Sequence, residues 1–401
     1  MLSPVEVYED MLFGEWGDAE LDFLAEARRF EFNEFRQSLI DRHLVDVTSD
    51  ANGAKLSMHR VLKRHILQQI DDAGTERLNL IFVRAVAMVR RQFPKAHELQ
   101  TPTSEASVEC ERCLPHILSL VAVYRDWASK IRPPFDLATL LANTATNYTW
   151  ERGLTHVALP ILEMGERVCN KLSHVEEISL VRANICAIAG CVFKDIGLSG
   201  RAIALEKCKK GLELRQGRVQ ALQSRGDPVD ASTFLQLANA LNDVGVAKLA
   251  YGCFEKALPY LLESQRLKEE QAGEEDIPWH YGELYKNLAF VKLHQGDALA
   301  AEDMARRSCD LCSLGRTETD ASTQSVRSIL GIVLMNIGKM DEALRLHKGV
   351  YRARKQFLGE THLHTKNSQY LVAELSRRKG KLSKAEFNFR AALSQCEFSW
   401  S

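Results

Sequence analysis

The sequence contains two Cys-x-x-Cys pairs that could each supply half of a zinc site. Cys110 and Cys113 form one pair, and Cys309 and Cys312 form the other. Each pair falls in a predicted helix, where residues three apart share a face and two thiols could reach one ion. The pairs are almost 200 residues apart, and neither has a nearby histidine to complete it. Packing of reduced cysteines inside helices is therefore favoured over metal binding, and no metal site is predicted.

Other catalytic motifs are missing from the sequence. His362 and His364 could hold a metal only loosely, and no Gly-x-Ser-x-Gly or His-Glu-x-x-His string occurs. The phosphate-binding string Gly-x4-Gly-Lys-Ser/Thr is also absent, so no loop is expected to hold nucleotide phosphates. We therefore expect neither enzymatic activity nor a cofactor.

The composition narrows the class of protein further. The 401 residues are 45% hydrophobic and 26% charged, as in ordinary globular proteins. The 52 basic residues are balanced by 53 acidic ones, which argues against a globally basic nucleic-acid binder. No apolar run approaches the roughly 20 residues of a membrane span, and the first residues lack a secretion signal. A cytoplasmic, helix-rich protein without a membrane segment is predicted.

A six-fold repeat organises most of the chain. Each unit has a small residue, a glycine seven positions later and an alanine five positions after that. The central glycines are separated by 44, 55, 44, 42 and 42 residues. The triplets are Thr146/Gly153/Ala158, Gly190/Gly197/Ala202, Gly245/Gly252/Ala257, Ala289/Gly296/Ala301, Gly331/Gly338/Ala343 and Ala373/Gly380/Ala385.

The triplet is typical of a helical hairpin. The small residue lets a second helix approach, the glycine ends the first helix, and the alanine seats the second helix against it. One hairpin cannot bury its apolar face alone, so neighbouring hairpins must stack. The 11 extra residues of the long interval fall within residues 215–230. We interpret them as one lengthened helix followed by a loop at Gly226-Asp227-Pro228.

The repeat resembles the tetratricopeptide repeat, in the 42-residue form of kinesin light chains and of fungal NLR-like proteins. Residues 286–302, 328–344 and 369–386 carry the resemblance, and the linker 357–368 is similar to the linker of that family, with Leu363 in place of its proline. The resemblance implies a mainly α fold. Residues 136–398 would form a right-handed tetratricopeptide-like superhelix of five or six helix pairs.

The N-terminal segment has a different pattern. Residues 19–39 have helical periodicity, with core candidates Phe23, Leu24, Phe30, Phe32 and Phe35. Strands are expected at 44–47 and 55–58, with a turn at Asn52-Gly53 and a helix afterwards. A helix, a hairpin and a second helix in this order make a winged-helix arrangement.

Residues 56–62 resemble the end of the winged-helix hairpin that follows the nucleotide-binding NB-ARC module in fungal NLR-like (STAND-class) proteins. Residues 82–94 and 110–120 are similar to the helical linker of those proteins. The resemblance implies a winged-helix segment at 1–75, a linker at 76–135 and the repeats at 136–398. The chain would then be the C-terminal part of a receptor, a separate short protein or a fragment.

His59 is the residue that this resemblance singles out. The matching histidine of NLR-like proteins lies near the phosphates of the nucleotide, and a role here would need an NLR-type nucleotide domain in cis or in trans. The favoured alternative is a histidine that pins the hairpin to the next helix through one hydrogen bond.

A polar stripe is expected on the first helices of the pairs, which line the concave face of such an array. Counting back from the small residues places asparagines and neighbouring residues on one helix face, where carboxamides could bind the backbone of an extended peptide. An ordinary solvated face is an equal alternative. The candidate groove residues are Asn143, Asn184, Asn239, Asn242, Lys286, Phe290, Asn367 and Tyr370.

The leading hypothesis is a non-catalytic scaffold that binds a protein or peptide partner in this groove. By resemblance it would be the sensing or autoinhibitory arm of an NLR-like protein. The alternative is a winged-helix transcription regulator with a repeat effector domain. The helix before the hairpin carries Glu31, Glu34 and Asp41, and a helix that reads DNA should not be acidic. Nucleic acid is therefore an unlikely partner.

Overall fold

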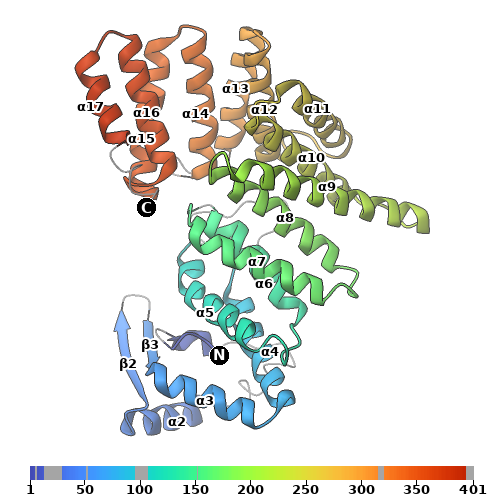
Figure 1. Cartoon of the computed structure of the whole chain (residues 1–401), viewed down its shortest axis with the longest axis vertical. Coiled ribbons are helices and arrows are strands. Elements are labelled where there is room, and N and C mark those ends of the chain that lie inside the picture. The colour runs from blue at the N-terminus through green and yellow to red at the C-terminus, as the bar shows by residue number, and fades with distance from the viewer. Residues whose placement is uncertain are drawn as a thin grey trace. The chain divides into compact units, whose positions relative to one another are not determined.

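The computed structural model describes residues 1–4, 7–12, 29–50, 53–94, 107–150, 152–314 and 320–393 (Figure 1). The chain divides into two compact units. Unit 1 comprises Met1–Tyr148 and His156–Ile185, and unit 2 comprises Thr149–Thr155 and Cys186–Ser401. No helix in the described ranges has both the length and the apolar character needed to cross a membrane.

Unit 1 contains a three-stranded antiparallel sheet in the order β1-β3-β2. Strands β2 (Val45–Asp50) and β3 (Gly53–Met58) pair from Val45 with Met58 to Asp50 with Gly53. The predicted hairpin is confirmed, and both strands are longer than expected; Asn52 of the predicted turn lies outside the described residues. The short strand β1 (Val7–Tyr8), which the sequence did not predict, pairs with β3.

The other described elements of unit 1 are helices. The short helix η1 (Glu9–Leu12) follows β1. The longer elements are α2 (Arg29–Asp41), α3 (Arg60–Asp72), α4 (Thr75–Gln92), α5 (Ser107–Asp126), α6 (Phe135–Thr144), η4 (Ala145–Trp150), α7 (Thr155–Lys171) and the first turns of α8 (Ile178–Asp195). The interior is formed mainly by α4, α5 and α6, through the fully buried Leu78, Phe82, Ile117, Leu137, Leu140 and Leu141.

Helix α2 departs from the expected core. Phe32 is half-buried, whereas Phe35 is 64% exposed, so the expectation that Phe35 belongs to the core is wrong. The helix contacts β2 through few residues, and Phe35 lies at the rim of an apolar pocket rather than under the sheet. Phe23 and Leu24, together with the side chain of Phe30, lie outside the described part of the chain.

Unit 2 is a series of helical hairpins that pack on one another (Figure 1). The second helix of each hairpin returns against the first, and the described hairpins follow one another along the chain. They are α8–α9 (Gly200–Arg225), α10 (Ala231–Ala250)–α11 (Phe254–Gln271), α12 (Pro278–His294)–α13 (Ala298–Ser313), α14 (Ala321–Asn336)–α15 (Met340–Leu358) and α16 (Leu363–Arg378)–α17 (Leu382–Leu393).

The predicted turn glycines are confirmed. All six central glycines have a positive φ, which favours glycine because it lacks a β-carbon. The small residues before them allow the predicted close approach: a β-carbon built on Gly190 would lie 2.3 Å from Sγ of Cys208, and one on Gly245 would lie 2.6 Å from Cδ2 of Leu261. The turn glycine and the small residue therefore set the hairpin geometry together.

One repeat corrects the predicted pattern. Ala202 is exposed, and the buried alanine of α9 is Ala204, which is 1% exposed. In the other hairpins the second helix begins two residues after the glycine, but α9 begins three residues after Gly197. The longer turn shifts the face that α9 presents to α8. The predicted lengthening is confirmed, since α9 has 26 residues and ends at Gly226, whose φ is 74°.

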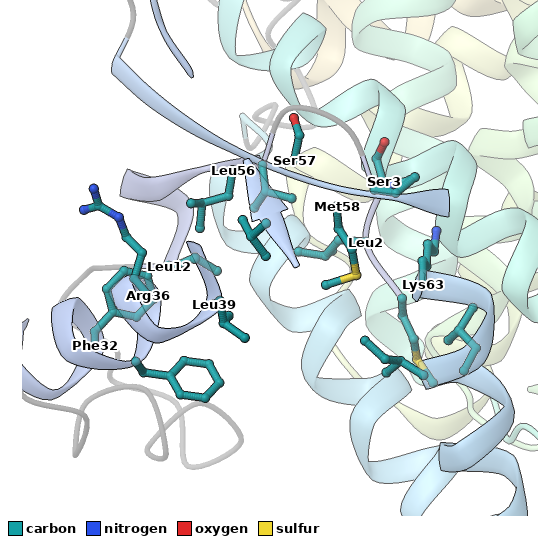
Figure 2. A pocket seen from close by; sticks show the side chains of 17 residues that line it. Leu2, Ser3, Leu12, Phe32, Arg36, Leu39, Leu56, Ser57, Met58 and Lys63 are labelled. Carbon is teal, nitrogen blue, oxygen red and sulfur yellow. The ribbon is translucent and has the colours of Figure 1, made fainter. Parts of the chain in front are cut away.

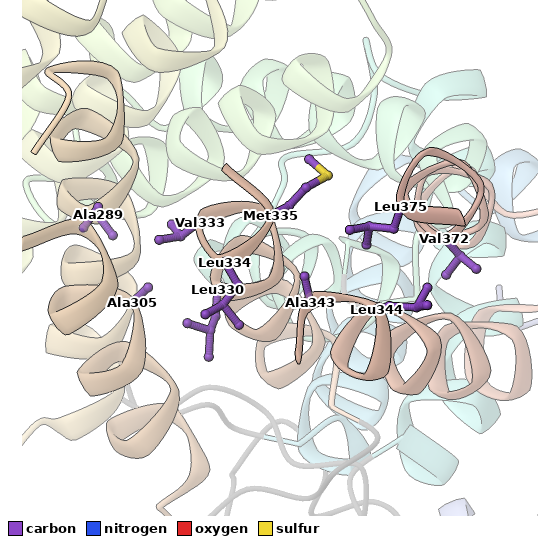
Figure 3. Close-up of a cluster of buried hydrophobic side chains, with 11 residues drawn as sticks. Ala289, Ala305, Leu330, Val333, Leu334, Met335, Ala343, Leu344, Val372 and Leu375 are labelled. Atoms are coloured by element: carbon purple, nitrogen blue, oxygen red, sulfur yellow. The ribbon is translucent and has the colours of Figure 1, made fainter. Parts of the chain in front are cut away.

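The hairpins share one continuous apolar interior at the C-terminal end of unit 2. Side chains from α12, α13, α14, α15 and α16 meet in a single cluster (Figure 3). Figure 3 shows Val333 directed toward Ala289 on one side and the side chains of Val372 and Leu375 on the other. Because each helix buries apolar side chains against two neighbours, these hairpins stabilise one another.

Candidate functional site

Charged side chains from five helices gather in unit 2. Lys194 of α8, Asp243 of α10 and Glu283 of α12 come from the first helices of their hairpins, while Arg215 of α9 and Lys268 of α11 come from second helices. These five residues, here called the polar cluster, interact electrostatically with Asp243 as the common member. Three cations and two carboxylates therefore share one region without a large net charge.

Burial shifts the pKa values of Asp243 and Lys268, the central pair of the polar cluster, in opposite directions. It raises the pKa of Asp243 to about 6, although Arg215, Lys268 and Lys194 oppose this shift. Burial also lowers the pKa of Lys268 to about 8, with Asp243 opposing it. Both shifts disfavour the charged form, so loss of water outweighs the attraction between the two groups. Such a pair is sensitive to anything that changes its access to water.

Lys268 fixes the orientation of one predicted groove residue. It is 1% exposed, and its Nζ donates to Oδ1 of Asn239 at 2.9 Å and to Oγ of Ser264 at 3.2 Å. Since an ammonium group can only donate, the carboxamide oxygen of Asn239 must face it. The NH₂ group of Asn239 then points the other way and has no hydrogen bond to a described residue.

A second carboxamide is held in the same manner. Nδ2 of Asn287, a buried residue of α12, donates to Oδ1 of Asn242 at 2.9 Å. The half-buried Asn242 is adjacent to Asp243 in α10, and Asn239 lies one turn earlier. Residues three and four apart lie on one helix face. The structure therefore brings together two oriented carboxamides and a carboxyl group.

The other predicted groove residues are placed less uniformly. Lys286 is half-buried and pairs with Glu283, and the half-buried Phe290 has its ring centroid 5.7 Å from that of Phe254. Asn367 is exposed, and Tyr370 is 49% exposed, with its ring edge-on to Phe389 at 5.3 Å. Asn143 and Asn184 are half-buried in unit 1, whereas the other six lie in unit 2.

Several members of the site were not predicted. Asp243 could have been noticed, because it follows Asn242 and lies four residues after Asn239. Lys268 and Arg215 lie on second helices, which the repeat assigns to the outer layer. Nothing in their spacing distinguishes them from solvated lysines and arginines.

His59 has a structural contact in this protein. It is exposed and precedes α3, where its Nδ1 accepts a hydrogen bond from the backbone N–H of Val61 at 3.3 Å. This bond satisfies one of the free amide groups at the start of the helix, as an N-cap does.

The Cys-x-x-Cys pairs are free thiols in helices. Cys110 and Cys113 are buried in α5, and burial raises the pKa of both thiols to about 12. Cys309 and Cys312 lie in α13, where Cys312 is buried. Within the described ranges, no cluster of three or more His, Cys, Asp or Glu side chains could hold a metal ion.

An apolar pocket of about 330 Å³ lies in unit 1 (Figure 2). Leu2, Leu39 and Met58 line it from the N-terminal segment, α2 and β3. Figure 2 shows Lys63 at the end opposite Phe32 and Arg36. Nζ of Lys63 donates to Oγ of Ser119 at 2.5 Å, and partial burial lowers the pKa of this lysine. The lining is almost entirely apolar.

A tetratricopeptide-repeat family model matches residues 321–397. The chain is 14% identical to BtubC from P. vanneervenii, with 63% of this chain and 92% of that chain covered and a TM-score of 0.43. It is 16% identical to a putative kinesin light chain from Podosopora anserina, with coverage of 57% and 100% and a TM-score of 0.39. A STAND protein with a tetratricopeptide repeat sensor from Pyrococcus horikoshii is 14% identical, with coverage of 98% and 63% and a TM-score of 0.37. No curated protein matches.

The stacked hairpins, their glycine turns and the matched repeat model define the class of protein. The chain is mainly α-helical, with a tetratricopeptide-like repeat fold and a small antiparallel sheet in unit 1. This class rests on the repeat geometry, and the polar cluster draws its residues from both the first and the second helices of the hairpins.

Proposed function

We propose that this protein is a non-catalytic scaffold that binds an extended peptide, or a segment of a protein, on the first helices of the unit 2 hairpins. The observation that carries the proposal is the fixed orientation of Asn239 and Asn242. Each carboxamide oxygen is occupied by a neighbour, so each NH₂ group is left as a donor. Two such donors one turn apart are suited to backbone carbonyl groups, which every peptide has.

The charges around these donors add selectivity. Asp243 and Glu283 can accept hydrogen bonds from backbone N–H groups or pair with a cation of the partner, while Lys194 and Lys286 can pair with an anion. The half-buried Phe290 offers an apolar contact beside them. Carbonyl recognition with balanced charges supports binding that tolerates many sequences and that prefers partners with both signs of charge.

We further propose that the partner-binding repeats act as the sensing or autoinhibitory arm of an NLR-like protein, with a winged-helix segment at 1–75, a linker at 76–135 and repeats at 136–398. The resemblance of residues 56–62 and of the 42-residue repeats supports this proposal. In that setting His59 would meet a nucleotide domain supplied in cis or in trans.

The test removes the donors and keeps the fold. Asn239→Asp and Asn242→Asp retain an oxygen for Lys268 and for Asn287, but each loses its NH₂ group. The double variant should capture at least about tenfold less peptide from a random-sequence library on resin, since each hydrogen bond lost is worth ~1 kcal/mol. Asn336→Asp, at an exposed position on α14, makes the same Asn-to-Asp substitution outside the proposed site and adds one of the two negative charges of the double variant, so it is the control for added charge. Equal capture by all three proteins would refute the proposed site.

A further inference from the structure

Unit 2 contains a set of contacts between segments about 200 residues apart. The guanidinium of Arg152 lies over the ring of Phe357, 4.7 Å from its centroid. The ring of His362 lies against Gly153 so closely that a β-carbon on Gly153 would be 1.8 Å from its Nε2. Nε2 of His364 is 3.8 Å from a carboxylate oxygen of Asp195. These six residues, here called the clasp, join the 152–153 turn and the end of α8 to the corner between α15 and α16.

His362 is the bridging residue of the clasp. Its Nδ1 accepts a hydrogen bond from the backbone N–H of His364 at 3.1 Å and so caps the start of α16. The ring also forms a hydrogen bond with the backbone of Gly153. This bond favours the protonated form of the imidazole, so the ring is the donor in it. One neutral imidazole therefore uses both nitrogens, one on each side of the clasp.

Hydrogen bonds of Arg354 hold the corner between α15 and α16 to the last hairpins of unit 2. The guanidinium of Arg354 donates to Oγ of Ser368 at 2.9 Å and to the carbonyl oxygens of His364 and Gln324 at 3.3 and 3.4 Å. Helices α14, α15 and α16 thus meet at one cation. Breaking the clasp should therefore separate the corner from α8 rather than unravel α16.

The contact with α8 is weak and is connected to the polar cluster. Partial burial lowers the pKa of His364, which keeps the ring neutral at neutral pH, so its contact with Asp195 is not a strong ion pair. Asp195 is next to Lys194, and their charged groups are 3.6 Å apart. Lys194 acts on Asp243, so movement of the end of α8 changes the surroundings of the proposed binding residues.

We propose that the clasp is an autoinhibitory contact, which holds the first and last hairpins of unit 2 together and must open before a partner occupies the inner face. This inference rests on the proposed peptide-binding function. A clasp that is closed most of the time lowers the apparent affinity by the fraction of molecules that are open. Loosening the clasp then increases binding without any new contact to the partner.

One variant is designed to open the clasp, and a second is designed to lock it closed. His362→Ser removes the ring that touches Gly153 and keeps a good helix-capping side chain at the start of α16. The pair Gly153→Cys with His362→Cys places two thiols at the contact that the ring now makes, and a disulfide between them would lock the clasp. Gly252→Ala is the control for strain at a turn glycine, because its φ is +73° and its surroundings are empty.

Two readouts are measured on the full chain. Spin labels attached by non-cysteine chemistry at the exposed positions Leu198 and Thr361 report the distance across the clasp. The random-sequence peptide library reports binding. We expect longer distances and about threefold or greater capture for His362→Ser, and about threefold or greater loss for the oxidised lock, which reductant should reverse. Gly252→Ala and the oxidised wild-type protein should behave like the untreated wild type.

The outcomes separate this inference from the proposed function. If the wild type captures peptide in a manner sensitive to Asn239→Asp and Asn242→Asp, but the lock and His362→Ser change nothing, the clasp is not a gate and the function stands. If His362→Ser lengthens the distance and no variant captures peptide, the proposed function fails and the gate fails with it. Unchanged distances in His362→Ser would also overturn the inference.

Discussion

A β-carbon on Gly331 of α14 would lie 2.4 Å from Nε2 of His347 on α15, closer than two such atoms can approach. The imidazole is fully buried and occupies the space that the missing side chain leaves. Gly331 is the small residue of the fifth repeat triplet, and His347 lies four residues after its alanine. The two helices therefore reach their separation because a glycine faces a large ring.

Replacing Gly331 should be costly. We expect Gly331→Ala to lower the free energy of unfolding by about 2 kcal/mol, because the added methyl group must displace the ring or separate the helices. Gly349→Ala on α15 is the matched control, since nothing lies within 4 Å of its β-carbon. In urea titrations the control should be neutral or slightly stabilised, as alanine favours helices. His347→Ala should restore part of the loss in Gly331→Ala, and no such rescue would argue against this contact.

The burial of His347 predicts a pH dependence. Burial, helped by the nearby Arg354, lowers its pKa to about 4. The unfolded chain takes up a proton near pH 6.5 and the folded one does not, so the stability due to the neutral ring is lost as the pH falls from about 6.5 to 4. His347→Leu lacks this loss. We expect the free energy of unfolding of His347→Leu, measured against that of the wild type, to be about 2–3 kcal/mol higher at pH 4.5 than at pH 8. Parallel stability curves at the two pH values would contradict the buried neutral ring.

Asp243 predicts the opposite trend. Its pKa is raised to about 6, so the folded protein keeps a proton that the unfolded chain releases near pH 4. Stability from this group is therefore present at low pH and is lost as the pH rises from about 4 to 6. Asp243→Asn, which imitates the protonated form, should be more stable than the wild type by about 1 kcal/mol at pH 7.5 and nearly equal to it at pH 4. Thermal unfolding at the two pH values measures this, and a less stable variant at pH 7.5 would show that the carboxylate is needed.

The shifted register of α9 predicts an unequal pair of substitutions. Ala202→Lys should change the stability by no more than about 0.5 kcal/mol, because the residue is exposed. Ala204→Lys places a long charged chain at a buried position and should cost about 3 kcal/mol or more. Urea unfolding of both variants tests the register. If Ala202→Lys cost more stability than Ala204→Lys, Ala202 would be the buried alanine, as the sequence repeat predicts.

Much of the fold was predictable because it depends on local residue types. The turn glycines at 252, 296, 338 and 380 adopt positive φ, and each is followed by a helix that buries the predicted alanine. The hairpin between β2 and β3 followed from two apolar runs around Asn52-Gly53. The extra residues before Gly226 lengthened α9 as expected. Such features need only a few adjacent residues, and their physical cause acts over one or two turns of chain.

Only the tertiary structure decided which polar groups meet. The sequence determined that Asn239 and Asn242 share a helix face, but the partner that orients each came from another helix: Lys268 from α11 and Asn287 from α12. The register of α9 depended on one added residue in a turn, which rotated Ala204 inward. Gly153 meets His362 because the four hairpins from α8–α9 to α14–α15 bring them together. Periodicity fixes the face of a helix, whereas contacts between distant helices depend on the summed geometry of every hairpin between them.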